Sequence, residues 1–315
     1  MKKSDFRKYI AYVKEQRHSS IEDYYIEKDY FLSMFLSTWQ QLRNEGKLYH
    51  LDALIFKGGT LLVRNFLGYP RISEDLDFTH EESTVLRTLK SEEKRETEIK
   101  KRVLPIIEDL KTLCDHASFD FHTDRTNTRY VEVRNSRAVY VFHIYYRSMI
   151  TGEEIPLKIE INFLEKIIHR CPVSKINTIV TADVYLKSIG YDLENRTMKT
   201  YPLEEMVLEK YRALLTRDAL KERDVLDLFL IDARCMDVFE CDTMLIVDKI
   251  ACGTLISPVS AKNLKRNCQS LATEGFSHSD DDISRFTFVD INDEEYARFK
   301  DRLYTRLKEI CTRCR

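Results

Sequence analysis

Residues 57–77 hold the side chains best placed to do chemistry. Asp75 and Asp77 stand two residues apart, downstream of a glycine pair, Gly58 and Gly59. In an extended segment, residues two apart point to the same face, so the two carboxylates would lie side by side. Carboxylate oxygens are preferred ligands of Mg²⁺, and paired carboxylates can hold the ions that orient a triphosphate. The spacing therefore predicts a site for magnesium triphosphate.

The glycines supply a backbone that a phosphate can approach closely. Residues 54–56 form a short apolar run that predicts a strand, and Gly58 and Gly59 follow it directly. Glycine allows a sharp turn because it has no side chain. Residues 60–67 then predict a helix, whose N-terminal N–H groups attract phosphate. A second strand, which carries the two aspartates, is expected to begin near Ile72.

These motifs, taken in order, resemble those of the AbiEii/AbiGii toxin family, which is a branch of the polymerase-β-like nucleotidyltransferases. The matching segments are Phe56-Lys57-Gly58-Gly59-Thr60-x-Leu62, Arg71-x-Ser73-x-Asp75-x-Asp77, Lys210 with Arg217, Arg223-Asp224-x-x-Asp227 and, upstream, Ile26-Glu27-Lys28-Asp29-Tyr30. The resemblance covers roughly residues 20–235. Each piece alone is weak, and the combination in this order is specific.

The resemblance implies an α/β fold in two parts. A polymerase-β-like nucleotidyltransferase domain with a small mixed sheet would occupy residues 1–185, and a helical domain over 186–315 would close the nucleotide cleft. The implied reaction transfers NMP from an NTP to an acceptor and releases pyrophosphate, with two Mg²⁺ ions. The implied role is the toxin of a type IV-like toxin–antitoxin or abortive-infection system, opposed by a cognate antitoxin protein. Relatives that extend tRNA 3′ ends make tRNA the expected acceptor.

A third metal ligand is expected from a neighbouring strand, as in other polymerase-β-like sites. Glu160 is the candidate because it lies in an alternating segment, on the face opposite Leu157, Ile159 and Ile161. It would align a metal ion or activate the attacking hydroxyl. The alternative is a solvent-exposed strand face on which Glu160 simply pairs with Lys158.

Three further side chains flank the predicted triphosphate site. Lys57 precedes the glycines and is expected to contact phosphate, and Thr60 follows them at the start of the helix. Ser73 is expected to donate a hydrogen bond to a γ-phosphate, or to be an acceptor for modification itself. Together with Gly58 and Gly59, these residues form the expected nucleotide-binding set.

A second set of charged residues lies downstream. Lys210 and Arg217 are two helical turns apart and share a face. Given the resemblance, both are expected to contact the triphosphate, Lys210 as a point charge and Arg217 as a bidentate donor. Asp224 would orient them or reach the acceptor. A purely structural network, in which Arg223 pairs with Asp227, stays open.

The overall charge does not indicate a nucleic-acid partner. The chain has 315 residues, with 50 Lys and Arg against 52 Asp and Glu, so any contact with RNA must come from a local patch. The local basic clusters are Lys94-Arg95 with Lys100-Lys101-Arg102, and Lys262 with Lys265-Arg266. A tRNA acceptor would have to be held by groups of this kind.

No apolar run approaches the length that spans a membrane, and the N-terminus lacks an apolar signal core, so a cytoplasmic protein is expected. Among the eight cysteines, only Cys311-x-x-Cys314 has a suggestive spacing. With no second pair nearby, reduced thiols in a helix are expected instead of a zinc site.

The remaining pattern predicts how these residues are positioned. Residues 117–163 alternate with period two and predict three adjacent antiparallel strands, whereas residues 91–102 and most of the chain after 185 predict helices. Glu27, Lys28 and Asp29 lie on a helix, either as a solvated face or as support for the nucleotide site. Residues 236–315 carry no functional motif.

Three other functions remain open. A small-molecule nucleotidyltransferase of the aminoglycoside-modifying kind fits the near-neutral charge. The same fold could also serve a kinase-like or protein-modifying enzyme. The third alternative is a catalytically silent NTP-binding regulator, against which the intact pair Asp75 and Asp77 argues.

Overall fold

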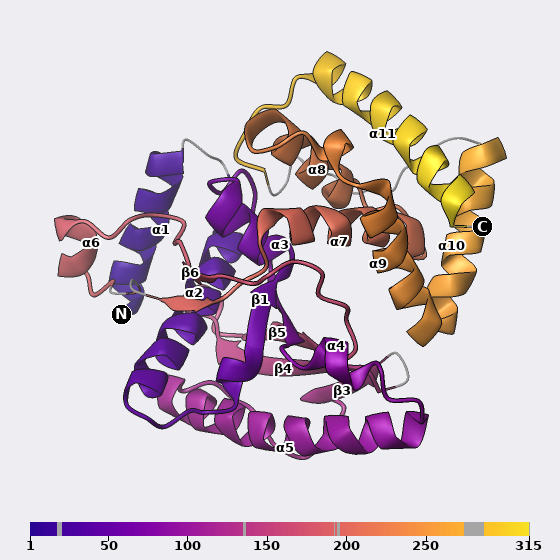
Figure 1. The fold of residues 1–315 in the computed structure, drawn as a ribbon. Helices are drawn as coiled ribbons and strands as arrows, with labels where there is room; N and C mark the ends of the chain where they lie inside the picture. The colour runs from indigo at the N-terminus through magenta and orange to yellow at the C-terminus, as the bar shows by residue number, and fades with distance from the viewer. Residues whose placement is uncertain (18–20, 135–136, 192, 194–195, 274–286, 315) are drawn as a thin grey trace. The chain divides into compact units, whose positions relative to one another are not determined.

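The computed structural model describes residues 1–17, 21–134, 137–191, 193, 196–273 and 287–314 (Figure 1). Two compact units are present. Among the described residues, the first comprises Met1–Leu164, Cys171–Thr200 and residues 287–288. The second comprises Glu165–Arg170 and the described residues from Tyr201 onward, apart from 287–288. The main part of the helical unit thus begins at Tyr201, while a functional division at 185/186 stays a prediction.

The first unit is built on a five-stranded mixed sheet with the order β1-β2-β5-β4-β3. Its strands are β1 (Leu54–Lys57), β2 (Asp75–His80), β3 (Val131–Arg134), β4 (Val139–Arg147) and β5 (Glu154–Asn162). β2 runs parallel to β5, and the other neighbouring pairs are antiparallel. The predicted small mixed sheet and the antiparallel order of β3, β4 and β5 are confirmed.

One face of this sheet is apolar and packs against helices. Leu76 and Phe78 of β2 are buried, with Ile159 and Ile161 of β5 beside them in register. The helix α2 (Asp23–Asn44) covers this face, and the Trp39 ring lies 5.5 Å from that of Phe78. α5 (Glu92–Ala117) packs beside α2 (Figure 1). On the opposite side, β2 and β5 carry charged residues, which are Asp75, Asp77, Lys158 and Glu160.

The glycine segment differs from expectation in its boundaries. α3 (Gly58–Leu61) begins at the first glycine, not after the pair, and a π-helical turn, Leu62–Phe66, continues it. β2 begins at Asp75, not near Ile72. The register explains the later start, because the pairing of β2 with β5 begins at Asp75, opposite Lys158.

Short elements complete the first unit. A two-stranded antiparallel sheet joins β6 to β7, apart from the main sheet. The bounds of these remaining elements are α1 (Lys3–Arg17), a 3₁₀ turn (Leu51–Ala53), α4 (Ser83–Leu86), β6 (Val173–Lys175), α6 (Val184–Ser188) and β7 (Thr197–Lys199).

The second unit is helical, as predicted. Its elements are α7 (Leu203–Thr216), α8 (Glu222–Arg234), a 3₁₀ turn (Val238–Glu240), α9 (Thr243–Ile256), α10 (Pro258–Thr273) and α11 (Asp293–Arg313). α9 and α10 pack on α7, so the stretch without a functional motif builds the core of this unit. Within the described ranges, no helix is both long and apolar enough to cross a membrane.

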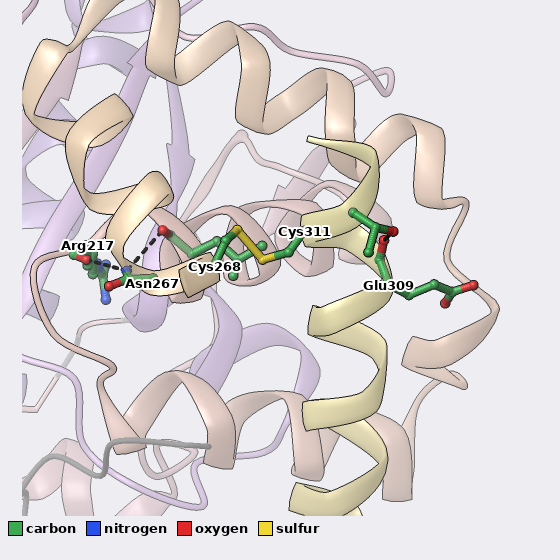
Figure 2. The surroundings of a disulfide bond; sticks show 7 residues. Arg217, Asn267, Cys268, Glu309 and Cys311 are labelled. Carbon is green, nitrogen blue, oxygen red and sulfur yellow. Dashed lines mark hydrogen bonds between the residues drawn. A yellow bond between two sulfur atoms is a disulfide. The ribbon is translucent and has the colours of Figure 1, made fainter. Parts of the chain in front are cut away.

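A disulfide in the second unit corrects the expectation of reduced thiols. Figure 2 shows Cys268 of α10 bonded to Cys311 of α11, with their Cα atoms 5.5 Å apart. Cys314 is free. The short spacing in the sequence is between Cys311 and Cys314. The residue bonded to Cys311 is instead Cys268, which lies 43 residues upstream on a neighbouring helix.

Candidate active site

The polar face of the sheet brings the predicted acids together. Asp77 is in register with Lys57 of β1 on one side and with Glu160 of β5 on the other. Asp75 is in register with Lys158. Because register partners and residues two apart share a face, the three carboxylates point to the same side of β2 and β5.

One lysine lies among these acids. The Nζ atom of Lys158 is 3.3 Å from Oδ2 of Asp75 and 3.4 Å from Oε2 of Glu160. The pairing of Lys158 with Glu160, the structural alternative, is therefore present. It does not exclude a catalytic role, since the same ammonium also pairs with Asp75 and marks where a cation is attracted.

The charges on this face are not balanced around Asp77. Burial first, and then the nearby carboxylates of Glu160 and Asp75, raise the pKa of Asp77 to about 6, although Lys57 and Lys158 oppose the shift. Burial alone would lower the pKa of Lys158, yet the charges of Asp75 and Glu160 raise it overall. The site thus favours additional positive charge.

The glycine turn lies directly against these acids. A Cβ atom on Gly58, whose φ is +79°, would lie 2.7 Å from Cγ of Asp77. A Cβ atom on Gly59 would lie 2.9 Å from Oγ of Ser73. The Thr60 hydroxyl donates a hydrogen bond to the backbone carbonyl of Asp75. A larger residue at Gly58 would push the turn away from Asp77, and one at Gly59 would collide with Ser73.

Most of the chain matches the model of one protein family. A family model described as the nucleotidyl transferase AbiEii toxin of the type IV toxin–antitoxin system matches residues 47–307. The chain belongs to the AbiEii family. The predicted resemblance is confirmed, and the protein is a nucleotidyltransferase toxin of a type IV system.

Solved structures resemble this AbiEii protein only distantly. JHP933 from Helicobacter pylori gives a TM-score of 0.43 at 12% identity, covering 94% of this chain and 95% of that one. A second crystal structure from H. pylori gives 0.42 at 13%, covering 93% and 97%. No curated protein matches the chain significantly. The assignment rests on the family model.

The donor set of this AbiEii protein suits a hard cation. Asp75, Asp77 and Glu160 offer only carboxylate oxygens, the ligands that Mg²⁺ prefers. Yet the described residues contain no group of three or more His, Cys, Asp or Glu side chains already placed around one metal position. The oxygen ligands are therefore of the type that Mg²⁺ binds. The ammonium of Lys158, which now pairs with Asp75 and Glu160, would have to move away for the metal to bind.

The charged run on α2 proves to be internal support and not a solvated face. Glu27, Lys28 and Asp29 are all buried. Lys28 holds Glu74, the residue before Asp75, at 2.9 Å. Glu27 accepts hydrogen bonds from the Ser148 hydroxyl (2.7 Å) and the Met149 amide (2.6 Å) in the β4–β5 turn, and Asp29 pairs with Arg64 at 2.6 Å.

The burial of these supporting residues follows from how completely α2 is covered. Consecutive helical residues point in directions about 100° apart, so three buried neighbours require a helix covered on nearly all sides. The flanking residues Ile26, Tyr30, Phe31 and Leu32 are indeed buried around the helix. Buried charges need partners, and two of these partners border the site: Glu74 directly precedes β2, and Arg64 lies in the helical turn after the glycines.

The second predicted set also comes together, within the helical unit. Nζ of Lys210 lies 2.7 Å from Oδ1 of Asp224 and 2.6 Å from Oδ2 of Asp227, and Arg217 pairs with Asp224. Burial would raise the pKa of Asp224, but the charges of Lys210 and Arg217 lower it overall. Arg223 is exposed. These pairs favour a structural network for Lys210 and Asp224 in which Lys210 is a partner of Asp227, while the pairing of Arg223 with Asp227 stays a prediction.

Proposed function

We propose that this AbiEii enzyme transfers NMP from an NTP to an acceptor hydroxyl at the polar sheet face that carries Asp75, Asp77 and Glu160. The observation that supports the proposal most strongly is the meeting of three carboxylates with the turn at Gly58 and Gly59. Acids crowded against a turn without side chains suit a metal-bound triphosphate. Pyrophosphate is the leaving group.

In this proposal each residue has a distinct task. Asp75, Asp77 and Glu160 hold divalent metal, Mg²⁺ in the first place. When bound, the metal neutralises phosphate charge and lowers the pKa of an attacking hydroxyl. Lys57, which is nearly buried beside Asp77, and Ser73, next to Gly59, contact phosphate oxygens. Thr60 fixes the turn to Asp75 through its hydroxyl.

Arg217 is the member of the second set best suited to meet a nucleotide. Its side chain is 46% exposed, whereas those of Lys210 and Asp224 are 9% and 5% exposed. A guanidinium held by one carboxylate still has free donors for a phosphate. We therefore propose that Lys210 and Asp224 hold Arg217 in place and do not act on the nucleotide directly.

The proposed acceptor is a tRNA 3′ end, and the proposed opponent is a cognate antitoxin protein, both in keeping with the family. The two basic clusters differ in how free their charges are. On α5, Lys101 lies 2.7 Å and Arg102 lies 2.8 Å from Glu98, and so their charges are partly neutralised. On α10, Lys262 and Lys265 are exposed. The α10 cluster is the better candidate for RNA contact.

The test is a transfer reaction with total RNA, Mg²⁺ and each α-labelled NTP in turn. A labelled tRNA-sized band with one preferred nucleotide is expected, and it should vanish in Asp77→Ala. Label found only on small molecules would instead indicate a small-molecule nucleotidyltransferase, and label found only on protein would indicate a protein-modifying enzyme. Absence of label from every fraction would favour a silent NTP-binding regulator.

A further inference from the structure

A second charged cavity lies in the first unit. It has a volume of about 230 Å³. Its lining includes Arg17, Arg64, Lys175, Asn177 and Arg196. Four lining residues carry positive charge, none is acidic, and none belongs to the proposed catalytic set. A cavity that holds benzene measures about 150 Å³, so a small anion would fit this one.

Arg196 is the most unusual member of this lining. Its side chain is fully buried, and its Nη1 donates to the Ser33 carbonyl at 3.1 Å. Its Nε and Nη2 have no hydrogen-bond partner among the residues that the structure describes. Unsatisfied buried donors are costly, and each such group in a native protein calls for an explanation such as a bound ion.

The surrounding charges leave the cavity positive. Asp29 is the carboxylate that pairs with Arg64, at 2.6 Å. Arg17 donates to backbone carbonyls, those of Ile179 (2.9 Å) and Gly68 (3.1 Å), which do not cancel its charge. Burial and the neighbouring Arg64 lower the pKa of Arg196 only to about 10, so it stays protonated at neutral pH.

We propose that this cavity binds a phosphate-class oxyanion. The anion contacts two accessible cations, the half-buried Arg17 and the exposed Lys175. The fully buried Arg196 attracts it through its positive charge. Asn177 adds a neutral donor from the same lining, because its side-chain amide has two hydrogens and donates one of them to the Arg64 carbonyl at 3.2 Å. The free nitrogens of Arg196 are covered by neighbouring atoms, so they reach the anion only if its side chain shifts. The proposal is independent of the transfer reaction.

Calorimetric titration in chloride buffer without divalent metal tests this site, with inorganic phosphate, pyrophosphate and a nucleoside monophosphate as separate probes. If the nucleoside monophosphate binds most tightly, the anion is part of a nucleotide; if phosphate or pyrophosphate does, it is a free anion. A charge-assisted hydrogen bond contributes about 1.5 kcal/mol or more, so Lys175→Ala and Arg196→Gln should each weaken binding about tenfold. The matched control is Lys90→Ala, an exposed lysine of the same unit outside the lining, which should bind as wild type does.

Two further measurements separate this cavity from the catalytic face. Asp77→Asn should keep wild-type affinity for the probes, because Asp77 does not line the cavity. If Arg196→Gln does not fold, Lys175→Ala and Arg17→Gln carry the test instead. Saturable binding that is lost in the lining variants supports the proposal. No saturable binding of any probe at about 10 mM, or equal binding by all variants, would overturn it.

Discussion

Two groups of carboxylates, one in each unit, meet their cations in different ways. In the helical unit, Lys210 is shared by two buried acids, Asp224 and Asp227, and the pKa of Asp224 is lowered by its partners. On the sheet, Asp77 has acidic neighbours, and its pKa is raised to about 6, first by burial and then by Glu160 and Asp75.

The difference separates a cluster that stabilises the fold from one that is prepared for chemistry. A buried carboxylate that lies close to its cation already has what stabilises its charge, and breaking the pair costs folding free energy. A carboxylate with a raised pKa is held in an unfavourable charged state, which is common where a protein binds metal or catalyses a reaction. The two groups should therefore respond oppositely to mutation.

The largest effect is expected from Asp77→Ala. Loss of a metal ligand on the sheet should reduce turnover at least about 10³-fold, equivalent to about 4 kcal/mol of transition-state stabilisation. The fold should stay intact because Asp77 does not pack in the apolar core. Label transfer from an NTP, with circular dichroism as the folding control, measures both. Turnover within tenfold of wild type would remove Asp77 from the site.

The next effect concerns the helical unit. Asp227→Ala takes one of two carboxylates from buried Lys210, and removing a partner from a buried pair typically costs about 3–5 kcal/mol. The urea midpoint should fall accordingly. Arg223→Ala, an exposed neighbour on the same helix, is the matched control and should change little. Equal midpoints for both variants would mean that Lys210 does not depend on Asp227.

A smaller effect, of opposite sign, is expected for Asp77→Asn. Since the folded pKa of Asp77 is raised from 3.8 to about 6, wild-type stability is lost as the pH rises through this range. The asparagine variant should therefore be more stable above pH 7, by at most about 3 kcal/mol, and equal to wild type near pH 4. Unfolding midpoints in metal-free buffer across this range give the answer. A stability difference that does not vary with pH would contradict the raised pKa.

Local patterns in the sequence predict the sheet half of this comparison. Alternation placed Glu160 on a polar strand face, and the two-residue spacing placed Asp75 beside Asp77. The pairing of Asp77 with Glu160 depends on β5 lying between β2 and β4, a contact between distant segments that local periodicity does not encode. The AbiEii resemblance supplied the expectation of a third acid before that order was known.

Other features depended on packing that the sequence does not display. The disulfide joins Cys268 to Cys311 because α10 and α11 lie together, not because of any short spacing. Glu27 and Lys28 resemble surface charges until the surrounding helices and turns are known. Lys210 was expected to reach phosphate, and only the three-dimensional arrangement revealed that its ammonium pairs with two buried acids. Each difference arises where tertiary contacts override a local pattern.

The most direct test of the central claim compares two isosteric variants in one assay. Pyrophosphate release per folded molecule is measured for Asp77→Asn and Asp227→Asn, with Mg²⁺, an NTP and total RNA. The account predicts that Asp77→Asn is folded and at least about 10³-fold slower, whereas Asp227→Asn is less stable but within tenfold of wild type. A fully active Asp77→Asn, or a folded Asp227→Asn that has lost turnover to the same extent, would contradict it.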